Sequence, residues 1–349
     1  MKKYIALLLV FSSSMVWADL TPIVPQPLKK GDLIAIVFPA SFLDKSAEEG
    51  QLILNRKLAW LRSKGYRTIV YPSRVQIKGY LAGTDTQRAH NLMMAWKNNQ
   101  VKAIWCLRGG YGTPRMLDLL DYTWIRNHPK ILIGMSDITA LHQAIQKRTG
   151  LVTYLAPVFN YFDEADSDFD ATYAFSSLEQ VLVKQKTGII ELPEIAEKSA
   201  SSGQMLSSGK GRGRLVGGNL SLIACMCGTK WQLDTKGKIL LLEDVGEEIF
   251  RIDRMLWQIR EAGLLDKPAA VILGSWKDCK ASQRNSLSLD EVLDHYFAGK
   301  SYPVIKGFPT GHGNFQTTLP LNGLAEVDTE TMTVKLVNAP EKVPEAVEQ

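Results

Sequence analysis

The sequence predicts an α/β protein with two domains: a Rossmann-like N-terminal domain built on a parallel sheet, and a smaller C-terminal domain of mixed α/β type. From Gly31 onward, short apolar runs typical of buried strands alternate with helical segments. The 349 residues are enough for two hydrophobic cores. A Ser- and Gly-rich stretch at 199–213 then separates two alternating regions. We therefore expect domains at 30–160 and 212–338, joined by a connecting segment at 161–211.

In the N-terminal domain the apolar runs and their flanking turns place the elements in order. The expected strands are 32–39, 67–71, 101–107, 131–133 and 151–155. The expected helices are 47–64, 84–97, 114–120 and 137–150. Ser46 caps the first helix and Gly65 stops it. Strands that alternate with helices form parallel βαβ units, whose ligands bind beyond the carboxyl ends of the strands.

The rest of the chain gives a sparser pattern. The connecting segment holds one expected helix near 178–183. For the C-terminal domain we expect helices up to Cys227 and at 251–262 and 287–297, strands at 238–245 and 269–276, and two or three strands within 317–337. The tail at 339–349, with two prolines and many charges, is predicted to be disordered.

Residues 1–18 have the pattern of a secretory signal peptide. Lys2 and Lys3 precede an apolar core that is too short to span a bilayer, and Ala18 supplies a small residue before the expected cut. No Cys follows that core, which argues against a lipoprotein anchor, and no other run is long enough for a transmembrane helix. We therefore expect a periplasmic protein with no stable membrane insertion.

Charge and cysteine usage argue against a nucleic-acid-binding protein and against a zinc-binding protein. The formal net charge is +5, with both signs interspersed and no long basic run, so nothing indicates a nucleic-acid partner. Cys106 lies in a strand pattern, and Cys225 and Cys227 lie in a helix pattern, so buried free thiols are expected. The spacing of the four cysteines fits no zinc site.

The most informative stretch is 130–142. An apolar run at 131–133 is followed by Gly134, then by Ser136 at a turn, and Asp137 opens a helix. This is the arrangement of a nucleophile elbow, which exposes a hydroxyl and leaves the N–H of the next residue free for an oxyanion. The alternative is that Ser136 is an ordinary helix cap.

A glycine-rich turn, Arg108–Gly112, follows the neighbouring strand. Phosphate binding is one interpretation, but the turn lacks a dinucleotide fingerprint and a P-loop lysine. We favour a turn whose backbone N–H groups approach Ser136, because glycines at 109 and 110 allow close contact. A purely structural turn stays open as an alternative.

Two further side chains are candidates for chemistry. Glu243 follows three leucines in a strand pattern, and a carboxylate there needs a partner. That partner is either a catalytic group or a simple salt bridge from Arg251 or Arg254. His312 lies between two glycines on a loop, where we expect it to be mobile and exposed. The other histidines lie in or beside helical patterns and are expected to be solvated or to cap helices: His90, His128, His142 and His295.

With these residues assembled, the chain resembles the LD-carboxypeptidase family of serine peptidases, which includes muramoyltetrapeptide carboxypeptidases and microcin C self-immunity hydrolases. The resemblance covers about residues 30–335 and follows one order of motifs. The order Ser, acid, His is also that of the α/β-hydrolases, although the second glycine of their elbow is missing here. The matching motifs are Ala82–Asp85, Arg108–Gly112, Gly134–Thr139, Gly217–Leu220, Leu242–Val245 with Arg251–Leu256, and Gly311–His312.

The resemblance implies roles for these residues. Ser136 would be the nucleophile, His312 the general base, and Glu243 the acid that orients the imidazole. The backbone N–H groups of Asp137 and Gly110 would form the oxyanion hole. The implied reaction cleaves the amide between the L-centre of diaminopimelate and the terminal D-Ala of a peptidoglycan tetrapeptide stem, with no metal and no cofactor.

Alternatives to this function remain at this point. One is a related amide hydrolase that acts on another peptide conjugate of the microcin type. The other is a non-enzymatic periplasmic binding protein, which would not need the three side chains together. Recycling members of the family act in the cytoplasm, whereas this chain is expected to be exported. Export points to muropeptides or the sacculus as the substrate. Whether the protein forms a homodimer is left open by the sequence.

Overall fold

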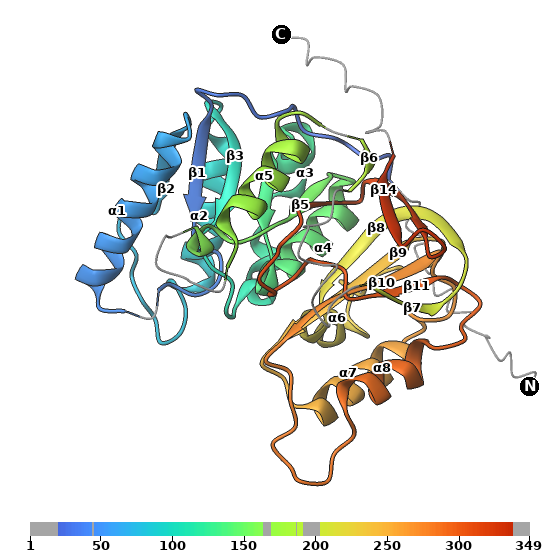
Figure 1. Ribbon diagram of the computed structural model, residues 1–349. Coiled ribbons are helices and arrows are strands. Elements are labelled where there is room, and N and C mark those ends of the chain that lie inside the picture. Colours follow the sequence, from blue (N-terminus) through green and yellow to red (C-terminus); the bar gives the residue numbers. More distant parts are fainter. Residues whose placement is uncertain (1–19, 44, 163–168, 186, 191–202, 338–349) are drawn as a thin grey trace, which may run out of the picture.

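A computed structural model describes residues 20–43, 45–162, 169–185, 187–190 and 203–337 of the chain. The predicted signal peptide at 1–18 and the predicted tail at 339–349 lie outside the described residues. The described chain forms two α/β halves that lie side by side, each organised around one sheet (Figure 1). This confirms the predicted fold class.

The first sheet has six strands in the order β12-β5-β4-β3-β1-β2. Neighbouring strands are parallel, except that β12 runs antiparallel to β5 at one edge. The strands are β1 (Leu33–Val37), β2 (Arg67–Tyr71), β3 (Val101–Cys106), β4 (Ile131–Gly134), β5 (Thr153–Leu155) and β12 (Leu319–Leu321). Because β12 comes from far along the chain, the C-terminal part of the sequence completes the N-terminal sheet.

Helices cover both faces of this sheet, as in a doubly wound fold. One face packs against α2 (Asp85–Lys97), α3 (Tyr122–Asn127) and α4 (Thr139–Thr149), and the other against α1 (Ala47–Ser63) and α5 (Ala171–Leu182). Helix α3 and the first turns of α5 were not predicted from the sequence. The short 3₁₀ helices are η1 (Thr113–Leu119), η2 (Ser136–Ile138) and η3 (Phe159–Tyr161). Capping boxes at Ser46 and Thr84 fix the starts of α1 and α2.

The second sheet has eight strands in the order β6-β14-β13-β8-β9-β10-β11-β7. Its centre, from β8 to β11, is parallel, and the flanking pairs are antiparallel. The strands are β6 (Gly188–Ile189), β7 (Gln204–Ser207), β8 (Lys210–Asn219), β9 (Ile239–Val245), β10 (Ala270–Lys277), β11 (Val304–Lys306), β13 (Leu324–Asp328) and β14 (Thr333–Leu336). The helices α6 (Leu220–Met226), α7 (Ile249–Glu261) and α8 (Leu289–Phe297) cover one face.

Strand β8 was not predicted, because its glycines hide the apolar pattern of a strand. The structure shows why glycine is needed there. A Cβ at Gly211 would lie 2.1 Å from the carbonyl oxygen of Ala269, and one at Gly217 would lie 2.1 Å from that of Leu241. Glycine therefore lets neighbouring backbones approach in the middle of the sheet.

The two halves share a core. One buried apolar cluster contains Leu141 and Ile145 of α4 together with Leu241 and Ile272 of the second sheet. The segment 307–318 crosses from β11 in the second sheet to β12 in the first. His312 lies on this crossing segment, so the fold brings it to the junction of the two halves.

The structure bears on two sequence predictions, the burial of the cysteines and the lack of a membrane-spanning helix. All four cysteines are free. Cys106 is buried as predicted, but Cys227 is only half-buried and Cys225 is exposed, so the prediction of a buried thiol is wrong at Cys225. Cys225 lies on the solvent side of the short helix α6, where one apolar face is enough for packing. No described helix is both long and apolar enough to cross a membrane.

Candidate active site

Ser136 lies at a strained turn directly after β4. Its φ angle is +63°, in the left-handed region that non-glycine residues rarely adopt. It begins the 3₁₀ helix η2, and no side-chain capping hydrogen bond is formed at that helix start. The interpretation of Ser136 as an ordinary helix cap is therefore wrong. A strained serine between a strand and a helix is the geometry of a nucleophile elbow.

The glycine-rich turn Arg108–Gly112 lies against this elbow. A Cβ added at Gly109 would lie 2.8 Å from Cβ of Ser136 and 3.3 Å from the backbone N of Asp137. Just after the turn, the N–H of Thr113 donates to Oδ2 of Asp137 at 2.8 Å. Burial raises the pKa of the Asp137 carboxyl, and the hydrogen bonds from Thr113 oppose that rise. Glycine is thus required at 109 for the turn to reach the elbow, as the sequence indicates.

His142 supports the elbow by a hydrogen bond to the backbone at the end of β4. Its side chain is fully buried in α4, and its Nε2 atom lies 2.9 Å from the carbonyl oxygen of Gly134. Since a carbonyl only accepts, Nε2 carries the proton and donates it. Burial lowers the pKa of His142 to about 4, so the ring is neutral near pH 7. The sequence prediction of a solvated or capping role is wrong for His142, because tertiary packing buries that face of α4.

Three other histidines match their predictions, and the first, His90, lies exposed on α2. His128 follows α3, where its Nδ1 atom lies 3.0 Å from the carbonyl oxygen of Trp124 near the helix end. His295 lies exposed in the last turn of α8.

Glu243 and His312 form a buried pair. Nδ1 of His312 lies 2.6 Å from Oε2 of Glu243. Glu243 is fully buried near the end of β9, and His312 is only 7% exposed. The expectation that His312 is exposed is therefore wrong, because the crossing segment packs it against β9. Arg251 pairs with Glu247 at 3.8 Å, and the Arg254 guanidinium lies over the Phe250 ring at 5.4 Å. The partner of Glu243 is therefore His312 and neither arginine.

The electrostatics of this pair suit a general base. Burial by itself lowers the pKa of His312, but the negative charge of Glu243 and its hydrogen bond outweigh it, so the net pKa is raised. Since Nδ1–H donates to the carboxylate, the lone pair lies on Nε2 when the ring is neutral. The Glu243 pair therefore selects the tautomer in which Nε2 can accept a proton.

Glycine makes room for this carboxylate. A Cβ at Gly311, whose φ is +92°, would lie 2.6 Å from Oε2 of Glu243. A Cβ at Gly274 in β10 would lie 3.2 Å from Cβ of Glu243. The glycine before His312 is thus a requirement of the close histidine–glutamate contact.

The segment that carries His312 is held from two sides. On one side, Oγ of Ser275 accepts from the N–H of Gly313 at 2.8 Å. On the other side, helix α5 holds it: the Tyr173 hydroxyl lies 2.7 Å from Oγ1 of Thr317, and Oγ of Ser177 accepts from the N–H of Thr318 at 3.0 Å. None of these hydroxyl groups could be predicted from the sequence, because an isolated polar side chain carries no periodic signal.

Asp244, next to Glu243, is held by hydrogen bonds from neighbouring side chains. Its Oδ1 accepts from Nδ2 of Asn219 at 2.8 Å, and its Oδ2 accepts from the hydroxyl of Ser221 at 2.8 Å. Burial and the charge of Glu243 raise its pKa to about 6, although these hydrogen bonds favour the ionised form. Asp244 thus joins the end of β9 to the start of α6, and its hydrogen bonds go to Asn219 and Ser221.

The serine and the histidine pair lie at the same junction. Asn219 is the strand partner of Glu243, and its N–H donates to Oγ1 of Thr139 at 3.1 Å. Thr139 is the first residue of α4, three positions after Ser136. Within the described chain no hydrogen bond joins the Ser136 hydroxyl to His312. Apo active sites often hold such pairs at longer distances than the reacting complex.

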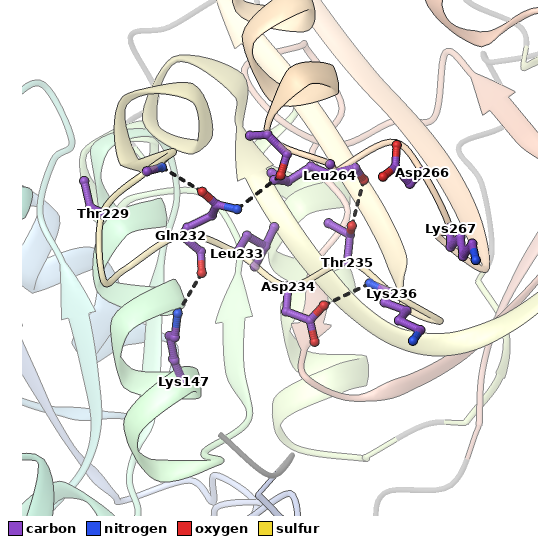
Figure 2. A pocket seen from close by; sticks show the side chains of 13 residues that line it. Lys147, Thr229, Gln232, Leu233, Asp234, Thr235, Lys236, Leu264, Asp266 and Lys267 are labelled. Carbon is purple, nitrogen blue, oxygen red and sulfur yellow. Dashed lines mark hydrogen bonds between the residues drawn. The ribbon is translucent and has the colours of Figure 1, made fainter. Parts of the chain in front are cut away.

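A cavity of about 710 Å³ lies elsewhere, between Lys147 at the end of α4 and the loops 228–236 and 262–267 (Figure 2). Its polar groups bond one another: Lys147 donates to the carbonyl of Gln232 at 2.9 Å, and Thr235 donates to that of Leu264 at 2.7 Å. It adjoins the beginning of β9, whereas Glu243 is near the end of that strand. This cavity is therefore separate from the candidate active site.

Comparison with known proteins identifies the family to which this chain belongs. The model of the LD-carboxypeptidase N-terminal domain matches residues 34–156, and that of the LD-carboxypeptidase C-terminal domain matches residues 212–327. The chain belongs to the LD-carboxypeptidase family. Ser136 lies in the first matched segment, and Glu243 and His312 lie in the second.

Curated relatives extend over most of this LD-carboxypeptidase. A probable murein peptide carboxypeptidase of Bacillus subtilis is 34% identical over 310 residues, which are 88% of this chain and 92% of that protein. The microcin C7 self-immunity protein MccF of Escherichia coli is 30% identical over 341 residues, 90% of this chain and 96% of that protein. A murein tetrapeptide carboxypeptidase of Pseudomonas aeruginosa is 36% identical over 243 residues, 67% of this chain and 75% of that protein.

Solved structures show the same two-domain fold. MccF in complex with glutamyl sulfamoyl guanosine superposes with a TM-score of 0.82 at 26% identity, covering 91% of this chain and 99% of that one. A muramoyltetrapeptide carboxypeptidase from Oxalobacter formigenes superposes with a TM-score of 0.72 at 28% identity, covering 88% and 100%. The protein is thus a serine-type carboxypeptidase, which excludes the non-enzymatic binding protein.

Proposed function

We propose that this enzyme removes the terminal D-Ala from peptidoglycan tetrapeptide stems, by cleaving its amide to the L-centre of diaminopimelate with a Ser136–His312–Glu243 triad. The observation that carries the proposal is the buried 2.6 Å contact between His312 and Glu243 at the junction where the Ser136 elbow lies. The relatives named as murein peptide and murein tetrapeptide carboxypeptidases support the substrate class.

In the first half-reaction Oγ of Ser136 attacks the diaminopimelate carbonyl carbon while Nε2 of His312 takes the hydroxyl proton. Glu243 stabilises the imidazolium that results, through the hydrogen bond to Nδ1. The backbone N–H groups of Asp137 and Gly110 hold the oxyanion of the tetrahedral intermediate. His312 then gives its proton to the leaving amine, D-Ala departs, and an ester to Ser136 remains.

In the second half-reaction water attacks this ester. His312 again acts as base, removing a proton from the water as it attacks, and returns that proton to Oγ of Ser136. The products are the tripeptide stem and free D-Ala, and every proton is accounted for within the triad. Neither half-reaction requires a metal. Among the described residues no group of three or more His, Cys, Asp or Glu side chains is arranged to hold one.

The experiment is incubation of the mature protein with tetrapeptide muropeptides, followed by mass spectrometry. Loss of one alanine residue, with the released alanine identified as the D enantiomer, is the expected result. Release of a longer fragment, or no cleavage, contradicts the proposed bond.

A related activity on a peptidyl-nucleotide is the second candidate, because MccF is similar over 90% of this chain. The two candidates are separated by supplying an aspartyl sulfamoyl nucleotide and a tetrapeptide muropeptide in parallel assays. We expect kcat/KM to be higher for the muropeptide. The predicted signal peptide favours this outcome, since an exported enzyme would meet the cell wall and not an intracellular nucleotide conjugate.

A further inference from the structure

Two exposed tyrosine rings pack on each other, and one of them belongs to the turn that contacts the candidate nucleophile. The rings of Tyr80 and Tyr111 are 5.4 Å apart between centroids and nearly perpendicular, at 79°. Tyr80 is 65% exposed and Tyr111 is 50% exposed. A single exposed aromatic ring is ordinary on a protein surface, but here two rings from different loops pack on each other and stay open to solvent.

Tyr111 belongs to the turn that touches the elbow. It lies two residues after Gly109, which packs on Ser136, and its N–H donates to Oγ of Ser41 at 3.3 Å. The glycines on either side of it, Gly110 and Gly112, have φ angles of +101° and +122°. The backbone that presents Tyr111 is therefore held by Ser41 on one side and leads from the glycine that packs on Ser136.

Tyr80 is presented by a second, equally fixed turn. Lys78 and Leu81 exchange backbone hydrogen bonds of 2.9 and 3.1 Å around Gly79 and Tyr80. The two turns also touch, since a Cβ at Gly112 would lie 2.5 Å from Cδ2 of the buried Leu81. Because neither turn needs to be ordered on binding, a ligand would meet a preformed pair of rings.

We propose that Tyr80 and Tyr111 bind a sugar ring of the glycan to which the stem peptide is attached. This inference rests on the proposed function and names the form of its substrate: a glycan-linked muropeptide in preference to the free peptide. A pyranose has faces of C–H groups that pack on an aromatic face, while its hydroxyl groups remain in water at such an open site.

The distances fit a substrate of that length. Tyr111 is two residues from the turn glycine at the elbow, which is about 7 Å of backbone at most. In a stem peptide, three residues, diaminopimelate included, lie between the scissile amide and the sugar-bearing end, which is about 11 Å of extended chain before the linkage to the sugar. A tyrosine side chain extends the reach of the turn further, so the sugar can lie on the ring pair while the scissile amide lies at Ser136.

The test compares two substrates that share the scissile bond: the free tetrapeptide and the same tetrapeptide linked to the disaccharide. For Tyr80→Ala we expect the ratio of kcat/KM, linked over free, to fall about threefold to tenfold, mainly through KM. Tyr80→Phe should restore the ratio, because packing on a sugar needs the ring and not the hydroxyl. Trp257→Ala on α7, an equally exposed aromatic residue at 52%, is the matched control and should leave the ratio unchanged.

Other outcomes overturn the inference. An equal loss on both substrates would mean that the rings contact the peptide, for instance the ammonium group of diaminopimelate, or only support the turn. An unchanged ratio would mean that the rings bind nothing in this reaction. If the wild type cleaves neither substrate, the proposed function fails. Calorimetric binding of the disaccharide-linked peptide to the Ser136→Ala protein, with and without Tyr80→Ala, then still tests the sugar site.

Discussion

Nδ1 of His312 lies 2.6 Å from Oε2 of Glu243, although 69 positions separate the two residues in the chain. Three features of the fold produce this contact. Strand β9 ends with a buried carboxylate, Gly311 leaves no side chain in the way, and the segment that carries His312 crosses from one sheet to the other. The other carboxylate oxygen of Glu243 is buried and has no hydrogen-bond partner in the described chain. The histidine is thus the one group shown to compensate the burial of this acid.

The first prediction follows from that contact. Glu243→Gln keeps the volume but removes the negative charge that raises the pKa of His312. We expect kcat/KM to fall by roughly 10²–10⁴, as when the orienting acid of a triad is neutralised. The acid limb of the pH–rate profile should also move to lower pH, because the histidine then loses its proton more readily. A profile with unchanged rate and unchanged limb would show that Glu243 does not act on the base.

The second prediction concerns the strained backbone at Ser136. Because its φ is +63°, glycine fits the position without the cost that a Cβ carries there. Both Ser136→Gly and Ser136→Ala should be inactive, but the glycine protein should be more stable than the alanine protein by about 1 kcal/mol. Urea unfolding of the two variants measures the difference. Equal stabilities would mean that the turn relaxes and stores no strain.

The third prediction concerns His142 and acid. Its pKa is lowered to about 4 in the folded state from an ordinary value of 6.5, so the unfolded chain binds more protons between those values. The stability that this neutral histidine contributes is complete above pH 6.5 and is lost as the pH falls toward 4. At pH 5 the loss is about 2 kcal/mol, which follows from the two pKa values.

Comparison with His142→Gln isolates this effect. A glutamine amide can donate to the Gly134 carbonyl as Nε2 does now, but it does not titrate. The free energy of unfolding of the wild type should therefore fall more between pH 7 and pH 5 than that of the variant. His142→Leu, which cannot donate, should lower kcat because the elbow backbone loses its support. An identical pH dependence in wild type and glutamine variant would contradict the buried neutral state.

Much of this arrangement could be predicted from the sequence, and the reasons are local. The run at 131–133, Gly134 and the residue order after it define a strand and a turn without any tertiary information. The same holds for α1, whose cap at Ser46 and stop at Gly65 are signals within a few residues. The family motifs implied the roles proposed for Ser136, Glu243 and His312, which no local pattern could have connected.

The features that could not be predicted from the sequence depend on contacts between distant segments of the chain. Strand β8 has too many glycines to appear as a strand, and only its neighbours Ala269 and Leu241 explain them. Leu319–Leu321 looked like part of the second domain, yet it pairs with β5 in the first sheet. A solvated or capping role was expected for His142 and an exposed position for His312, because neither a helix face nor a glycine-flanked loop reveals what packs on it. Tertiary packing decided each of these cases.

The fourth prediction concerns export. If residues 1–18 are a signal peptide, cleavage after Ala18 leaves Asp19 as the mature N-terminus. N-terminal sequencing of protein from the periplasmic fraction measures this directly. Protein recovered there with Met1–Ala18 intact, or protein confined to the cytoplasm, would contradict the proposed location.

The most direct test of the central claim is trapping of the acyl-enzyme. Wild-type protein is mixed with a tetrapeptide muropeptide, quenched in acid, digested and mapped by mass spectrometry. We expect an ester of the tripeptide stem on Ser136 in the wild type, and no adduct in Ser136→Ala. Release of D-Ala from the stem without Ser136, or an adduct on another residue, would contradict the proposed triad.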